Sequence, residues 1–141
     1  MKLIIVFLCL SSISALPITS KRKELLKKWN DLIAPYKSEC IKESGVLEED
    51  VNDVEKILLF PKNNNFKCYL YCLSKQLQVV DANGNYLPDK IVAVIPGMSK
   101  EMITKCISLL PKDTVSCNRS YVLTICGSQA ILVGMIENLI L

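Results

Sequence analysis

Apolar residues recur at helical spacing over most of the chain, and proline and glycine mark the breaks between these segments. Over 20–36 the apolar positions recur every three or four residues, with lysines between them. This spacing predicts an amphipathic helix that is bent or broken at Pro35. The segment 46–60 predicts a second helix that ends before Pro61. A third helix is predicted over 65–78.

The second half continues in shorter pieces. The segment 79–87 contains Asn83-Gly84, a dipeptide typical of hairpin turns, but its flanks alternate poorly and we predict a loop instead. Pro88 favours the start of a fourth helix, which Pro96-Gly97 closes. Together these breaks predict short helices.

Ser99 is placed to cap a fifth helix, which Pro111 ends. A sixth helical segment is predicted over 121–126. The last fifteen residues, 127–141, form an apolar tail that we expect to fold onto or into the body of the protein, because it is short for a membrane span. The fold class is all-α: a compact bundle of about six short helices.

The first fifteen residues combine a charged start, an apolar run and a small-residue end. This pattern predicts a secretory signal peptide over 1–15, with cleavage near Ala15, and a secreted, extracellular protein. An uncleaved membrane anchor is the alternative. The remaining chain, 16–141, is predicted to form a single domain.

Charge gives little indication of a partner. Removing Lys2 with the leader leaves 16 basic and 14 acidic side chains, a net charge of about +2. The basic residues over 21–28 lack interleaved aromatic residues, so we interpret them as a solvated helix face and expect no binding to nucleic acid.

The chain has no histidine. Ser-His-Asp and Cys-His catalytic machinery and histidine metal ligands are therefore excluded. The acidic run Glu48-Glu49-Asp50 could supply a carboxylate pair, but acidic residues in a first helical turn are favoured by the helix dipole alone. We expect no enzymatic activity, no bound metal and no cofactor.

Of seven cysteines, Cys9 lies in the predicted leader and six remain. An even number in an exported protein favours three disulfides, whereas zinc would require a ligand pattern that is missing here. Six cysteines allow fifteen pairings. Cys68 and Cys72 lie one helical turn apart and about 40° around the axis, so they can tie one helix to two other segments.

The six cysteines are separated by 27, 3, 33, 10 and 8 residues. This pattern, with Glu43-Ser44-Gly45-Val46, the segment 67–72 and Asp81-Ala82-Asn83-Gly84, resembles the insect odorant-binding protein family, including its pheromone-binding members. The resemblance covers about 23–126. It implies the disulfides Cys40–Cys72, Cys68–Cys117 and Cys106–Cys126, and a hydrophobic cavity inside the bundle.

The function that the resemblance implies is that of a secreted carrier, which binds a small hydrophobic molecule such as an odorant, pheromone or lipid in its cavity and delivers it, without catalysis, to a membrane receptor. It would act as a monomer or weak homodimer. Helical faces supply a candidate lining of apolar side chains with one polar contact: Ile33, Leu70, Ser74, Leu77, Ile91, Ile95, Ile103, Ile107 and Tyr121.

Two further expectations remain open. Without histidine, any pH response would depend on carboxylates such as Glu137, and the tail 127–141 would form a permanent wall or lid. The alternative function is a secreted helical signalling or interaction protein that acts through its surface, which predicts four long helices and an exposed apolar patch.

Overall fold

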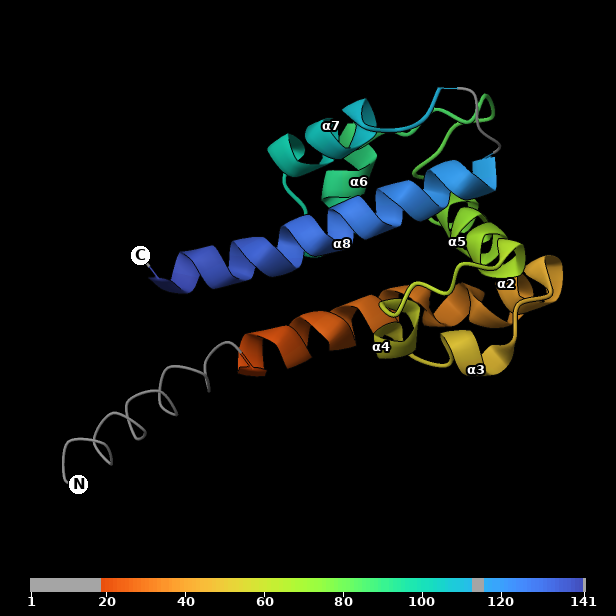
Figure 1. The fold of residues 1–141 in the computed structure, drawn as a ribbon, viewed down its shortest axis with the longest axis horizontal. Helices are drawn as coiled ribbons and strands as arrows, with labels where there is room; N and C mark the ends of the chain where they lie inside the picture. The colour runs from red at the N-terminus through yellow and green to blue at the C-terminus, as the bar shows by residue number, and fades with distance from the viewer. Residues whose placement is uncertain (1–18, 113–115, 141) are drawn as a thin grey trace.

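The computed structural model describes residues 19–112 and 116–140, and the predicted signal peptide lies outside these ranges. The described chain is a bundle of helices in which the last helix, α8, crosses the whole molecule (Figure 1). The fold class predicted from the sequence, all-α with three disulfides, is confirmed. The nearest approach to a sheet among these residues is one isolated bridge between Val80 and Tyr86.

The first helix covers 19–33 and changes character at Pro35, as predicted. Pro35 lies in a 3-10 turn, η1 (Ala34–Tyr36), which leads directly into α2 (Lys37–Ser44). Gly45 ends α2 in the left-handed conformation, with φ 69°, and its N–H donates to the carbonyl of Ile41. Glycine adopts this conformation at no steric cost, which explains the sharp end of the helix.

The single helix predicted over 46–60 is wrong. The structure has two short helices, α3 (Glu48–Val51) and α4 (Val54–Ile57). Asp53 separates them: its backbone is extended, and its carboxylate accepts the Lys56 N–H at 2.9 Å. An aspartate that caps a new helix interrupts the preceding one.

Helix α5 (Asn64–Gln76) lies close to the predicted 65–78, with the Asn63 side chain as its cap. It packs against both α2 and α8. Its buried residues include Phe66, Tyr69 and Leu73. It is therefore the central helix of the bundle.

Helices α6 (Pro88–Val94) and α7 (Lys100–Ser108) follow the sequence signals. Pro88 is the first residue of α6, and the Ser99 hydroxyl accepts the Met102 N–H at 3.2 Å, so the predicted cap of α7 is confirmed. The connection 79–87 is a loop with a single bridge, organised by Asp81, whose carboxylate accepts the N–H groups of Asn83 and Asn85.

The sixth helix is much longer than predicted. Helix α8 (Ser116–Ile140) is continuous, so the bounds 121–126 predicted for the sixth helix are wrong, and the described part of the apolar segment 127–141 continues the same helix. By length and composition alone, Ser116–Asn138 could cross a membrane. We interpret it as a helix of the domain, because Cys117 and Cys126 bond it to other helices and Leu123 and Ile131 lie in the core.

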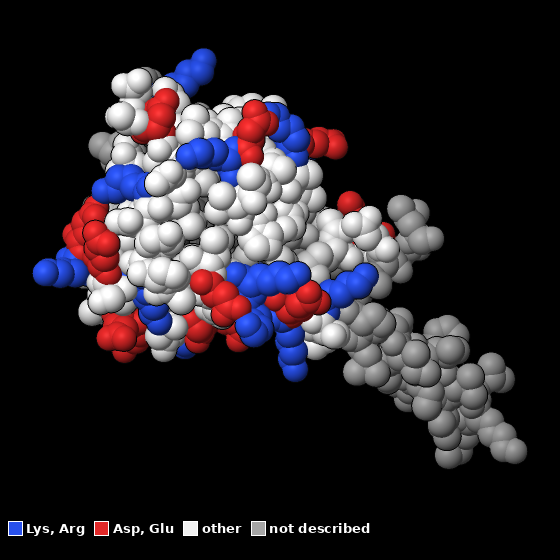
Figure 2. Space-filling model, turned by 180° about the vertical axis from the view of Figure 1, so that it is seen from behind, with Lys and Arg blue, Asp and Glu red and all other residues white. Residues whose placement is uncertain are grey.

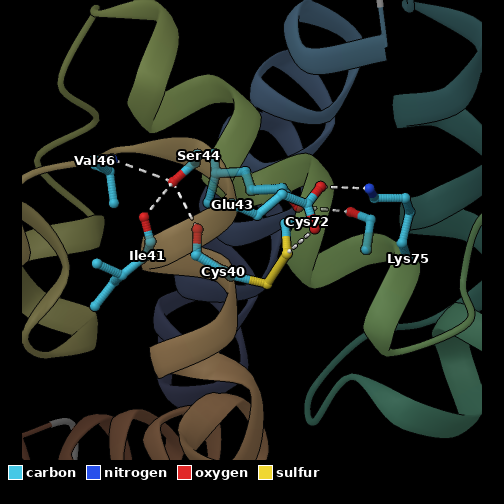
Figure 3. Close-up of a disulfide and its surroundings, with 9 residues drawn as sticks. Cys40, Ile41, Glu43, Ser44, Val46, Cys72 and Lys75 are labelled. Carbon is cyan, nitrogen blue, oxygen red and sulfur yellow. Dashed lines mark hydrogen bonds and ion pairs between the residues drawn. A yellow bond between two sulfur atoms is a disulfide. The ribbon is translucent and has the colours of Figure 1, made fainter.

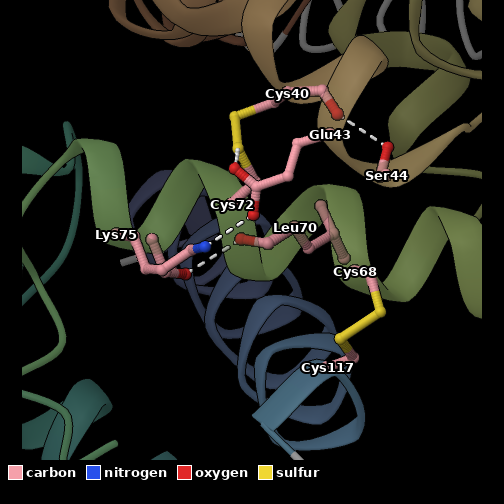
Figure 4. Close-up of polar contacts among 9 residues, drawn as sticks. Cys40, Glu43, Ser44, Cys68, Leu70, Cys72, Lys75 and Cys117 are labelled. Carbon is pink, nitrogen blue, oxygen red and sulfur yellow. Dashed lines mark hydrogen bonds and ion pairs between the residues drawn. A yellow bond between two sulfur atoms is a disulfide. The ribbon is translucent and has the colours of Figure 1, made fainter. Parts of the chain in front are cut away.

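Three disulfides join the helices, and their pairs are those that the resemblance implies: Cys40–Cys72, Cys68–Cys117 and Cys106–Cys126. The first links α2 to α5 beside an ion pair between Glu43 and Lys75 (Figure 3). The first two leave α5 toward different helices, α2 and α8 (Figure 4). Helix α5 is therefore held from two sides.

Candidate functional site

An apolar cavity of about 170 Å³ lies between the first helix and helices α4 to α8. Its wall is almost entirely aliphatic and aromatic. Helix α5 presents Leu70, Leu73 and Ser74 to it, and Leu77 follows at the helix end. The remaining lining residues come from the other elements: Trp29, Leu32, Ile33, Val54, Ile57, Leu58, Val79, Tyr86, Ile91, Ile95, Met98, Ile103, Leu123, Thr124, Gly127, Ser128 and Ile131.

Seven of the nine residues predicted as ligand contacts line this cavity: Ile33, Leu70, Ser74, Leu77, Ile91, Ile95 and Ile103. They come from four helices and their ends, so the fold brings them together. Leu70, Ser74 and Leu77 share one side of α5, while Cys68 and Cys72 hold the helix to α8 and α2. The disulfides therefore fix the wall without occupying the cavity.

Two predicted contacts, Ile107 and Tyr121, fall outside the lining. Ile107 is half-buried and packs against the cluster formed by α6, α7 and α8. The Tyr121 ring stands edge-on to Phe60 and Phe66, with centroids 6.3 Å apart in each pair, and its hydroxyl donates to the Phe60 carbonyl at 2.9 Å. Tyr121 shares a helical face with Ser128 but lies two turns nearer the start of α8, where these aromatic partners hold it outside the lining.

The largest omission from the sequence prediction is the wall made by α8. Thr124, Ser128 and Ile131 follow one another at i, i+4 and i+7, which is the spacing of a single helical face. The sequence contains this signal, but it crosses the boundary between the predicted sixth helix and the predicted tail. The part of the tail that the structure describes is therefore continuous with a cavity wall.

Tyr86 provides the cavity with its titratable side chain. Its hydroxyl is hydrogen-bonded to the hydroxyl of Ser120, which is 1% exposed. Burial raises the pKa of Tyr86, and hydrogen bonds with Ser120 and Ser74 act in the opposite direction. The phenol is therefore neutral over the physiological range.

The outer surface carries both signs of charge. Lys and Arg are interspersed with Asp and Glu over the face in Figure 2. The basic segment 21–28 pairs with neighbouring acids: Lys27 with Asp31, Lys28 with Glu24, and Arg22 with Glu55. This arrangement agrees with a solvated helix face.

Within the described ranges, no group of three or more Cys, Asp or Glu side chains is placed to hold a metal ion.

Comparison with known proteins agrees with this geometry. The model of the PBP/GOBP family matches residues 22–130, which include all six disulfide-bonded cysteines. The chain belongs to the PBP/GOBP family. This confirms the resemblance to insect odorant-binding proteins found in the sequence.

Two Drosophila melanogaster relatives of this PBP/GOBP protein extend the match. General odorant-binding protein 19d is 29% identical over 122 residues, covering 79% of this chain and 76% of the relative. General odorant-binding protein 57c is 23% identical over 131 residues, covering 87% and 83%. No solved structure gives a significant match.

Proposed function

We propose that this protein is a secreted carrier, which takes up a small hydrophobic molecule in the cavity between helices α4 to α8 and the first helix, and releases it unchanged. The observation that carries the proposal is the cavity itself, an apolar space of about 170 Å³ inside a small domain. Membership of the PBP/GOBP family and the names of the two relatives support the role of a small-ligand carrier.

The energetics of the cavity favour a ligand. A closed apolar void of this size would cost roughly 4 kcal/mol at about 24 cal/mol per Å³, and this space, which is partly open to solvent, costs less. Each disulfide stabilises the fold by about 2–4 kcal/mol, so the domain tolerates the cavity. An apolar guest gains about 0.8 kcal/mol for each methylene group removed from water.

The chemistry of the lining supports binding without catalysis. Its described residues include no carboxylate and no amine, and the chain contains no histidine. The serine and threonine hydroxyls in the wall therefore have no general base beside them. The rival function, signalling through the surface, predicts four long helices, whereas most helices described here are short.

Displacement of a fluorescent probe tests the proposal. The apolar fluorophore N-phenylnaphthylamine should bind the mature protein at one saturable site and be displaced by medium-chain aliphatic molecules. Its affinity should be the same at pH 7 and pH 5, because the carboxylate considered from the sequence, Glu137, is exposed and lies outside the lining. The absence of saturable binding would reject the carrier function.

A truncated protein tests the role of the last helix. Removing residues 127–141 takes away Gly127, Ser128 and Ile131 from the wall but keeps Cys126 and its disulfide. We propose that this segment is a permanent wall, so truncation should weaken probe binding by tenfold or more at both pH values. Unchanged affinity would show that this segment does not form a wall of the cavity.

Delivery to a membrane receptor, and action as a monomer or weak homodimer, are further parts of the proposed function.

A further inference from the structure

The polar groups in the cavity wall share one property: their hydrogen atoms are already donated within the protein. Trp29 donates its indole N–H to the Pro96 carbonyl at 3.0 Å. Three hydroxyls donate to backbone carbonyls of their own helices: Ser74 to Leu70 at 3.0 Å, Thr124 to Ser120 at 2.7 Å and Ser128 to Ile125 at 3.1 Å.

Tyr86, the fifth polar side chain of the described lining, is paired with Ser120 behind the wall. That pair is the one place where the donor is interchangeable. Ser120 is 1% exposed and is not among the lining residues, so its hydroxyl is turned to Tyr86 and not to the cavity. Tyr86 also hydrogen-bonds with Ser74, so in either arrangement its hydrogen atom goes to Ser120 or to Ser74. The donors of the wall are therefore committed, whereas the hydroxyl oxygens of Thr124 and Ser128, and one lone pair of Ser74, can still accept a hydrogen bond.

A hydroxyl group has one hydrogen atom and two lone pairs. After Ser74, Thr124 and Ser128 have each donated to a carbonyl, their oxygens retain lone pairs that can accept a hydrogen bond from a guest. A guest that only accepts, such as an ether, would find a matching donor only if one of these hydroxyls rotated and abandoned its carbonyl.

The lack of charged side chains in the described lining further restricts the chemical class of the guest. Its described residues include no lysine, arginine, aspartate or glutamate. A carboxylate or ammonium group on the guest would be buried without a counter-ion, which is costly. The wall suits a neutral group that donates a hydrogen bond.

We infer that the cavity selects neutral hydrogen-bond donors, namely aliphatic alcohols, over acceptor-only molecules of the same size. Thr124 and Ser128 on α8, with Ser74 on α5, form the subsite for the ligand hydroxyl. This inference rests on the proposed carrier function and adds the class of ligand to it.

Two ligands with the same number of non-hydrogen atoms test the inference: octanol and heptyl methyl ether. Partition into a purely apolar space would favour the ether, because it has less hydrogen bonding to water to lose. In titrations of the mature protein with probe displacement, we expect octanol to bind about five- to tenfold more tightly than the ether.

Variants that remove the acceptors complete the experiment. The triple variant Ser74→Ala, Thr124→Val, Ser128→Ala should reduce the preference for octanol to within about twofold, while its affinity for the ether is unchanged or higher. Thr104→Val, an exposed site on α7 outside the lining, is the matched control and should keep the full preference.

The outcomes separate the two proposals. Equal binding of both ligands by the unmodified protein, or tighter binding of the ether, would overturn the ligand class but leave the carrier function intact. A preference for octanol that survives in the triple variant would overturn the assigned subsite. Failure of both ligands to displace the probe would reject the carrier function itself.

Discussion

The terminal methyl group of Met98 lies in the space that the absent side chain of Gly127 leaves on α8. A Cβ atom at position 127 would be only 3.0 Å from Met98 Cε, and both residues line the cavity. Gly134 has the same relationship to Met102, with a distance of 3.1 Å, but neither of these two residues lines the cavity. The same contact thus occurs once inside the site and once outside it.

Gly127→Ala should weaken ligand binding several-fold without destabilising the fold. The added methyl group displaces the flexible end of Met98, which must move within the cavity wall. Alanine is favoured over glycine inside a helix by about 1 kcal/mol, which offsets the crowding. Probe titration and urea unfolding of the variant measure the two effects separately.

Gly134→Ala is the matched control, because it makes the same change against the same kind of side chain. It should leave the affinity unchanged. If both variants weaken binding to the same extent, then the effect does not arise in the cavity.

Tyr86→Phe should destabilise the protein by about 1–2 kcal/mol. It leaves the buried Ser120 hydroxyl without its partner, and an unpaired buried hydroxyl loses more than the hydrogen bond itself. Urea unfolding of Tyr86→Phe, Ser120→Ala and the double variant measures the coupling free energy between the two hydroxyl groups. The double variant should be less destabilised than the sum of the single changes, and strict additivity would rule out the pair.

Unlike Tyr86→Phe, Tyr69→Phe should leave the free energy of unfolding at pH 7 unchanged or raise it by up to about 1 kcal/mol. Tyr69 is fully buried, and its hydroxyl has no hydrogen-bond partner within the described structure. Removing the hydroxyl therefore removes a desolvation cost without breaking a bond. A loss of more than about 1 kcal/mol in urea would reveal a partner.

The burial of Tyr69 also predicts how the free energy of unfolding changes at alkaline pH. Burial raises the pKa of Tyr69 to about 12, from the ordinary value of 10.0. Between these values Tyr69 is ionised in the unfolded protein but keeps its proton in the folded protein. The free energy of unfolding therefore has its full value below pH 10 and falls as the pH rises toward 12. The fall should be shallower in Tyr69→Phe. An identical pH profile for both proteins would contradict the assignment.

Two disulfides should differ in their contribution to stability. Cys68–Cys117 joins residues 49 apart and Cys106–Cys126 residues 20 apart. On the chain-entropy account, replacing the first pair by alanine should cost about 0.8 kcal/mol more than replacing the second. Thermal or urea unfolding of the two double variants measures the difference, and the reverse order would show that native packing outweighs loop length.

The parts of the fold that the sequence predicted well carry local chemical signals. Ser99 caps α7 and Pro88 begins α6, because a hydroxyl acceptor and a fixed φ act within one turn. The sequence prediction misses the break at Asp53 because Val51, Val54 and Leu58 keep helical spacing across it, although aspartate is favoured at a cap over a helix interior. The sequence prediction places a boundary at Gly127, although in α8 it is an interior glycine that Met98 packs against.

The site was predictable where a helix shows one apolar face, and less so where tertiary packing chooses between two. On α7, Ile103 is 1% exposed and lines the cavity, whereas Ile107, one turn later, is half-buried outside it. Successive i, i+4 positions drift by about 40° around a helix, and the sequence pattern does not say where the drift leaves the cavity. That depends on how α7 packs against α8.

The most direct test of the central claim is native mass spectrometry of the disulfide-intact protein with octanol, using a variant that fills the cavity. The unmodified protein should carry one octanol molecule per chain. Leu77→Trp, which places a large ring in the cavity wall, should carry none, whereas Leu47→Trp, at a site 62% exposed, should bind as before. Equal binding by Leu77→Trp, or no binding by the unmodified protein, would contradict the account.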